Sequence, residues 1–129
     1  MTLELWKDRA QKKLDPELFS KKAEEFAQQV SNEANSKLNK GTQLRKFFDE
    51  VLRLNAQAQV PGADWNLILP QVYMVIAKTA YAHGRGLVSK RFVDHMRQGI
   101  EQVESPEDLR IFTNHLEAFT GFYKMYNQN

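Results

Sequence analysis

The chain has 129 residues, of which 42% are hydrophobic and 26% are charged, a composition typical of one globular domain. It contains no cysteine, which excludes a disulfide framework, a thiolate metal site and a cysteine nucleophile. No apolar run approaches the roughly 20 residues that span a bilayer, and residues 1–15 lack the apolar core of a signal peptide. We therefore expect a cytoplasmic protein with no membrane partner.

The net charge of +2 hides an uneven distribution along the chain. Residues 1–35 carry six basic and seven acidic side chains (−1), residues 36–100 carry ten and four (+6), and residues 101–129 carry two and five (−3). A basic middle part favours a polyanionic partner, although a solvated surface can carry the same excess.

A first helix is predicted from Asp15 to about Asn35. The run Asp15-Pro16-Glu17 combines a capping side chain, a proline in the first turn and an acid near the positive end of the helix dipole. An apolar stripe follows at helical spacing, formed by Phe19, Ala23, Phe26 and Val30. Residues 1–14 precede this helix and are expected to be loosely ordered.

Two further helices are predicted in the basic part of the chain. Thr42 is expected to cap a helix that fades by Gln57, with an apolar face formed by Leu44, Phe47, Phe48 and Val51. After a turn at residues 60–64, proline should break any helix already under way, so the third helix is predicted to begin at Pro70. Asp64 would then cap a single turn at most. The third helix should end at Gly84 and Gly86, and its expected buried side consists of Val72, Tyr73, Ile76, Ala80 and Tyr81.

The last two helices have clear start signals. Ser89 is expected to cap a helix that buries Phe92, Val93, Met96 and Ile100. Ser105, followed by a proline and two acids, predicts the start of the last helix. The apolar stripe of that helix is Leu109, Phe112, Leu116, Phe119, Tyr123 and Tyr126, widened by Ile111, Ala118 and Phe122. No segment alternates in the manner of a strand, so residues 1–129 are predicted to form a single all-α domain of five helices.

Catalytic motifs are scarce in this sequence. The three histidines lack the spacing of a zinc site, so we expect no bound metal and no cofactor. His95 is interpreted as a residue of a solvated helix side beside Asp94 and Arg97, and His115 as a half-buried ring with one satisfied nitrogen. The acids around Glu104 and Asp108 surround a helix start, where the dipole favours them without any acid–base role. We therefore expect no enzymatic activity.

The basic residues are more informative than the histidines. Between Asp64 and Asp94 the chain contains no acid, so Lys78 and Arg85 have no sequence-local partner. Arg45, Lys46 and the acids that follow them by four positions are also explained as surface ion pairs. Basic side chains spread over helices and helix ends, without a recognition helix, are expected to contact phosphates rather than bases. The candidate contacts are Lys40, Arg45, Lys46, Arg53, Lys78, Arg85, Lys90 and Arg91.

Three segments, in this order, resemble the small-subunit family of type III-A CRISPR effector (Csm) complexes. The first is Thr42-Gln43-Leu44-Arg45-Lys46-Phe47, and the second runs from Lys78 through Tyr81 to Gly84-Arg85. The third is the aromatic stretch from Phe112 through Leu116-Glu117-Ala118 to Phe122-Tyr123-Lys124. The resemblance spans residues 42–124, and each motif by itself is short.

The resemblance implies a five-helix protein without catalytic activity that stacks in several copies along a ribonucleoprotein. Its partners would be single-stranded target RNA, the guide–target duplex, other Csm subunits and copies of itself. Arg45, Lys46, Lys78 and Arg85 match family-like positions, whereas Lys40, Arg53, Lys90 and Arg91 are added from the charge pattern. The alternative is a helical interaction module that forms a homodimer through its C-terminal aromatic helix, with a basic surface that serves only solvation.

Overall fold

The computed structural model describes residues 2–127, and within this range it contains five α-helices and no strand. This confirms the all-α prediction, and the chain folds as one compact domain. In chain order the elements are a short 3₁₀ helix η1 (Pro16–Phe19), α1 (Lys21–Glu33), α2 (Gly41–Ala58), α3 (Trp65–Gly84), α4 (Lys90–Ile100) and α5 (Pro106–Tyr126). None of the described helices is long and apolar enough to cross a membrane.

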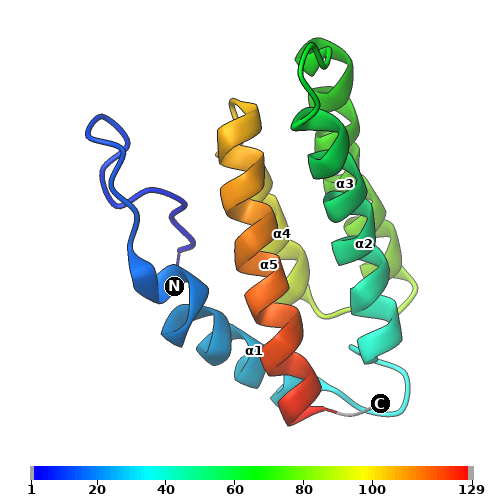
Figure 1. Cartoon of the computed structure of the whole chain (residues 1–129). Coiled ribbons are helices and arrows are strands. Elements are labelled where there is room, and N and C mark those ends of the chain that lie inside the picture. Colours follow the sequence, from blue (N-terminus) through cyan, green and yellow to red (C-terminus); the bar gives the residue numbers. More distant parts are fainter. Residues whose placement is uncertain (1, 128–129) are drawn as a thin grey trace.

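The last helix, α5, packs against three of the other four α-helices. Figure 1 shows α5 in the middle of the molecule, with α1 crossing its C-terminal half and α4 behind it. On the other side α5 packs against α2, which lies side by side with α3, and α3 in turn packs against α4. Because the connections between α2, α3, α4 and α5 are short, consecutive helices run in opposite directions.

Two of the five predicted helix starts, those at Ser89 and Ser105, are confirmed, and the other three differ. Ser89 and Ser105 each accept a hydrogen bond from the N–H three residues ahead, as N-caps do. Asp15 also caps, but it caps only the 3₁₀ turn, and α1 begins after a break at Ser20. The predicted cap Thr42 is wrong, because α2 already starts at Gly41 with Lys40 as its flanking residue.

The prediction that Pro70 starts the third helix is also wrong. Asp64 accepts a hydrogen bond from Asn66 N–H, and the helix runs without interruption from Trp65 through Pro70. Pro70 is the sixth residue of α3, so its missing N–H costs only the bond that would reach the Asn66 carbonyl, one turn from the helix end. A single lost bond near the end is tolerated because the rest of α3 packs against α2 and α4.

α3 turns a different face inward from the one predicted. Its buried residues are Ile68, Val72, Val75, Thr79 and Ala82, so only Val72 of the predicted set is fully buried. Tyr73 is 41% exposed and Tyr81 is 69% exposed. The helix is apolar on nearly all sides, and a pattern without a polar face cannot indicate which stripe points inward.

The core is rich in phenylalanine. Rings of Phe26, Phe47, Phe92 and Phe119 from four different helices stack or tilt against one another with centroids 4.9–6.5 Å apart. The stripe of α5 supplies one side of this core, since Leu109, Phe112, Leu116, Phe119 and Tyr123 are all buried. Most of the stripe predicted for the homodimer interface of the alternative interpretation is therefore used inside the chain, whereas Tyr126 at its end is exposed.

Asn39 joins four parts of the chain at one end of the bundle. It lies in the loop between α1 and α2 with a φ of 59°, a left-handed conformation that asparagine tolerates. Its N–H donates to Leu87 O (2.9 Å), its side-chain amide donates to Val30 O (3.2 Å), and its side-chain oxygen accepts from Ser89 N–H (2.9 Å). The Tyr123 hydroxyl of α5 donates to its carbonyl. The residue is fully buried, so each of these bonds replaces water.

The segment of residues 2–14 has no helix but is anchored through Asp108. This carboxylate is 1% exposed and accepts bonds from Trp6 Nε1 (2.8 Å), Arg9 (2.9 Å) and the Glu104 N–H (2.9 Å). Burial acts to raise the pKa of Asp108, but these three donors outweigh it and hold the pKa below its usual value. Leu3 and Leu5 of the same segment are buried in the core.

We expect Asn39→Gly to lower the free energy of unfolding by about 2–4 kcal/mol, because it leaves the Ser89 N–H and the Val30 carbonyl buried without partners. Asn39→Ala should cost about 1 kcal/mol more, since it adds left-handed backbone strain. Urea unfolding measures the free energy of unfolding of both variants. The control is Asn32→Ala, which replaces an exposed asparagine. Equal stability of Asn39→Gly and the control would show that the side-chain bonds contribute nothing.

Candidate nucleic-acid interface

The eight candidate phosphate contacts are all exposed, and they lie on three neighbouring helices. α2 and its start carry Lys40, Arg45, Lys46 and Arg53; α3 and its end carry Lys78 and Arg85; the first turn of α4 carries Lys90 and Arg91. Because α2 and α3 run side by side in opposite directions, the start of α2 meets the end of α3. The structure therefore brings some of these residues together and separates others along the helices.

The Asn39 junction creates a concentration of positive charge, which we call the basic end: Lys37, Lys40, Arg85 and Lys90. Asn39 bonds to Leu87 and Ser89, which places the residues that follow Asn39 and Ser89 in sequence beside each other. The Lys37 ammonium reaches the turn after α3, 3.6 Å from where a side chain on Gly86 would begin. Lys37 was not predicted, because its position depends on the left-handed turn at Asn39.

Lys78 is paired with an acid of another helix, although the sequence around it contains no acid. Its ammonium lies 2.8 Å from Glu50 of α2, and the other oxygen of Glu50 lies 2.7 Å from Arg53. Hydrogen bonds from Lys78 and then Arg53 lower the pKa of Glu50, more than its partial burial raises it. One acid thus compensates two candidate contacts across the α2–α3 packing.

Three more candidates are paired with acids. Lys90 binds Asp94 (2.9 Å) one turn further along α4, and Arg45 lies 3.4 Å from Asp49, as the four-residue spacing predicts. Arg91 reaches across to α1, where it lies 3.4 Å from Glu33. The positive charges of Lys78, Lys90 and Arg91 are therefore compensated by acids of neighbouring helices and by Asp94 itself.

Four basic side chains on this part of the surface have no acidic partner among the described residues: Lys37, Lys40, Lys46 and Arg85. Arg85 lies over the exposed ring of Tyr81, with the guanidinium carbon 5.9 Å from the ring centroid. A phosphate group at these side chains does not have to displace a carboxylate. They are the strongest candidates for an anionic ligand.

The histidines lie elsewhere than expected. His95 is not on a solvated helix side: its ring stacks on Phe26 with centroids 3.5 Å apart, and its Nε2 lies 2.9 Å from Nε2 of His115. His115 is fully buried rather than half-buried, and both of its nitrogens have partners, since Nδ1 bonds to Leu18 O (2.7 Å). Burial lowers the pKa of both rings, and the neighbouring His115 adds to the effect on His95. His83 is exposed and bonds to the Val88 carbonyl through Nδ1 (2.8 Å).

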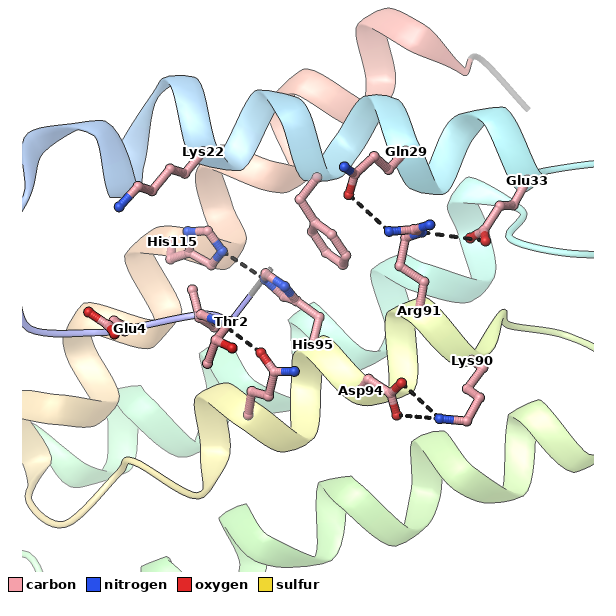
Figure 2. A pocket seen from close by; sticks show the side chains of 13 residues that line it. Thr2, Glu4, Lys22, Gln29, Glu33, Lys90, Arg91, Asp94, His95 and His115 are labelled. Atoms are coloured by element: carbon pink, nitrogen blue, oxygen red, sulfur yellow. Dashed lines mark hydrogen bonds and ion pairs between the residues drawn. The ribbon is translucent and has the colours of Figure 1, made fainter.

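A cavity of about 690 Å³ opens between α1, α4 and the first residues of the chain. Figure 2 shows the two helices on opposite sides of it, with the linked rings of His95 and His115 between them. Arg91 bridges the two helices at one end, where it bonds to Gln29 and lies close to Glu33. No group of described residues has the donor set of a metal centre.

The model of the Csm2 Type III-A family matches residues 13–129 of the chain. No curated protein and no solved structure is significantly similar to it. The match covers all five helices and the whole basic end, whereas residues 1–12 lie outside it.

The buried histidine pair predicts acid sensitivity. A folded-state pKa below the unfolded value of about 6.5 means that the pair contributes its full stability above pH 6.5 and loses it as the pH falls below that value. When the pH is lowered from 7.5 to 5.5, we expect the free energy of unfolding to fall by about 1–3 kcal/mol, as measured by chemical denaturation. His95→Phe, which keeps an aromatic ring against Phe26, should lose less stability over the same interval. A pH-independent wild type would contradict this account.

Proposed function

Since the chain belongs to the Csm2 Type III-A family and is thereby a subunit of a type III-A CRISPR effector complex, we propose that it acts there as a non-catalytic structural subunit that binds RNA backbone. Its ligands would be single-stranded target RNA and the guide–target duplex, held without sequence preference. Several copies would stack along the complex beside the other Csm subunits. The expected location is the cytoplasm, with which a cysteine-free chain is compatible.

The observation that carries this proposal is the uncompensated charge of Lys37, Lys40, Lys46 and Arg85 where α2 begins and α3 ends. Basic side chains held by helix ends are suited to phosphates, which bind largely through charge. The paired residues Arg45, Arg53, Lys78, Lys90 and Arg91 are weaker candidates, because a phosphate must compete with the acid that each already contacts.

We expect purified protein to bind unstructured RNA with a slope of log affinity against log salt near −2 to −3, for three or four phosphate contacts. In the double variant Lys40→Gln/Arg85→Gln the slope should become less steep by about 1.4, since each lost contact removes about 0.7. Filter binding at several salt concentrations measures both values.

The control is Lys13→Gln/Lys21→Gln, which removes the same charge from two exposed lysines far from the basic end in sequence. It should keep the wild-type slope. If both double variants changed the slope equally, the protein would be responding to net charge alone, and the proposed contacts would be wrong.

The assembly part of the proposal is supported by the outer stripe of α3, formed by Leu67, Pro70, Met74, Ala77 and Tyr81. These residues recur at spacings of three and four, and all are exposed. Leu67, Met74 and Tyr81 are 67%, 55% and 69% exposed, and none of the five residues is charged. A continuous apolar stripe on an outer helix favours a protein contact, here with another subunit or another copy.

Met74→Glu should leave the melting temperature nearly unchanged, because the side chain is mostly exposed. It should reduce incorporation into the reconstituted effector complex by about tenfold or more, because an unpaired carboxylate would be buried in the contact. Co-purification with the other subunits measures this. The control Gln28→Glu adds the same charge on an exposed site of α1, and equal incorporation of both variants would exclude this face from the assembly.

A further inference from the structure

Tyr81 lies in the last turn of α3, next to the basic end, and it is largely uncovered. The residue is 69% exposed, the highest value of any large apolar side chain between residues 2 and 127. It is also the last residue of the outer stripe of α3. Met74, at the middle of that stripe, lies seven residues earlier, which is about two turns or 10 Å along the helix. Tyr81 is thus the point at which the apolar stripe meets the uncompensated charge of Arg85.

The neighbours of Tyr81 on the surface of α3 leave room beside its ring. On a helix these neighbours are the residues three and four positions away, here Ala77, Lys78, Gly84 and Arg85. Ala77 offers only a methyl group, Gly84 has no side chain and borders open space, and Lys78 extends to an acid of α2. Arg85 is the neighbour that lies over the ring, with its guanidinium carbon 5.9 Å from the ring centroid. A flat group can therefore still reach the ring on the side away from the guanidinium.

Arg85 is fixed at its backbone and available at its charged end. Its N–H donates to Tyr81 O (3.2 Å) and Ala82 O (3.2 Å), which ties the residue to the last turn of α3. Its guanidinium has no acidic partner among the described residues. The next residue, Gly86, has a φ of 75° and carries no side chain that could shield the guanidinium. A phosphate can therefore approach Arg85 while the ring beside it stays accessible.

A cation beside an uncovered aromatic ring suits single-stranded nucleic acid, because the cation binds a phosphate and the ring stacks on a base. We propose that Tyr81 stacks on an unpaired base of the RNA strand whose phosphate binds Arg85. The inference rests on the proposed RNA binding and gives the basic end a preference for unpaired strands, since the bases of a duplex are stacked on one another. Every base has a π face, so this contact adds affinity without sequence preference.

A protein contact, as proposed for the rest of the outer stripe, is the other use of an exposed apolar ring. The charge of Arg85 favours the base. A protein that covered Tyr81 would also bury the guanidinium over it, and it would then have to supply an acid to compensate that charge. An RNA strand carries the compensating phosphate next to each base.

The test titrates the full-length chain, at several salt concentrations, with two strands of equal length and charge: oligouridylate and an abasic ribose–phosphate strand. We expect the wild type to bind oligouridylate about tenfold more tightly than the abasic strand. Tyr81→Leu should remove most of this difference and keep the salt slope, because no phosphate contact is lost, whereas Tyr81→Phe should retain the difference. The matched control is Tyr73→Leu, which removes another exposed tyrosine of α3 and should also retain it.

The salt slope separates this inference from the proposed function. A steep slope with equal affinity for the two strands, or a difference that Tyr81→Leu leaves intact, overturns the stacking while phosphate binding stands. A flat slope, or no binding of either strand, overturns the proposed function and this inference with it. If Tyr81→Leu retains the difference but is poorly incorporated into the reconstituted effector complex, the ring belongs to a protein contact instead. The melting temperature of the variant, expected to stay nearly unchanged for so exposed a residue, reports whether the fold is kept.

Discussion

The buried residue Asn39 holds together the end of the molecule on which the candidate interface depends. Its side chain bonds the loop before α2 to the end of α1 and to Ser89, and its backbone bonds the same loop to Leu87 and to Tyr123 of α5. A left-handed backbone and a side chain that both donates and accepts are needed at this one position, and asparagine supplies both. The packing of α2 against α3 brings the start of α2 to the end of α3, and this junction fixes the loop before α2 against the turn after α3, so that their basic side chains lie at one end of the molecule.

Pairing between helices then decides which of the cations remain available. Glu50 compensates Lys78 and Arg53 across the α2–α3 contact, and Glu33 compensates Arg91 from α1. The surface that results is less basic than the charge excess of residues 36–100 implies, and the uncompensated charge gathers near the Asn39 junction. Exposed pairs of this kind contribute little to stability, so their main effect is on where an anion can bind.

Sequence patterns predicted the number of helices and the starts of α4 and α5, because the serine caps Ser89 and Ser105 act locally. They predicted the inner face of α2 and α4 correctly, since each of these helices has a polar side. The face of α3 was mispredicted because that helix lacks a polar side, and the start at Pro70 because packing outweighs one lost hydrogen bond. For the candidate site, residue types were predictable, but the Lys78–Glu50 pair and the stacking of His95 on Phe26 arise from tertiary contacts.

The position of α5 has a consequence for the order in which the chain folds. α1 packs mainly against α5, the last helix to be synthesised, and the bonds of Trp6 and Arg9 to Asp108 span about a hundred residues. Contacts this distant in sequence form only after α5 has been translated, which makes them late steps in folding. The apolar face of α1 therefore lacks its main partner until then, and exposed apolar surface of this kind is what makes folding intermediates prone to aggregation.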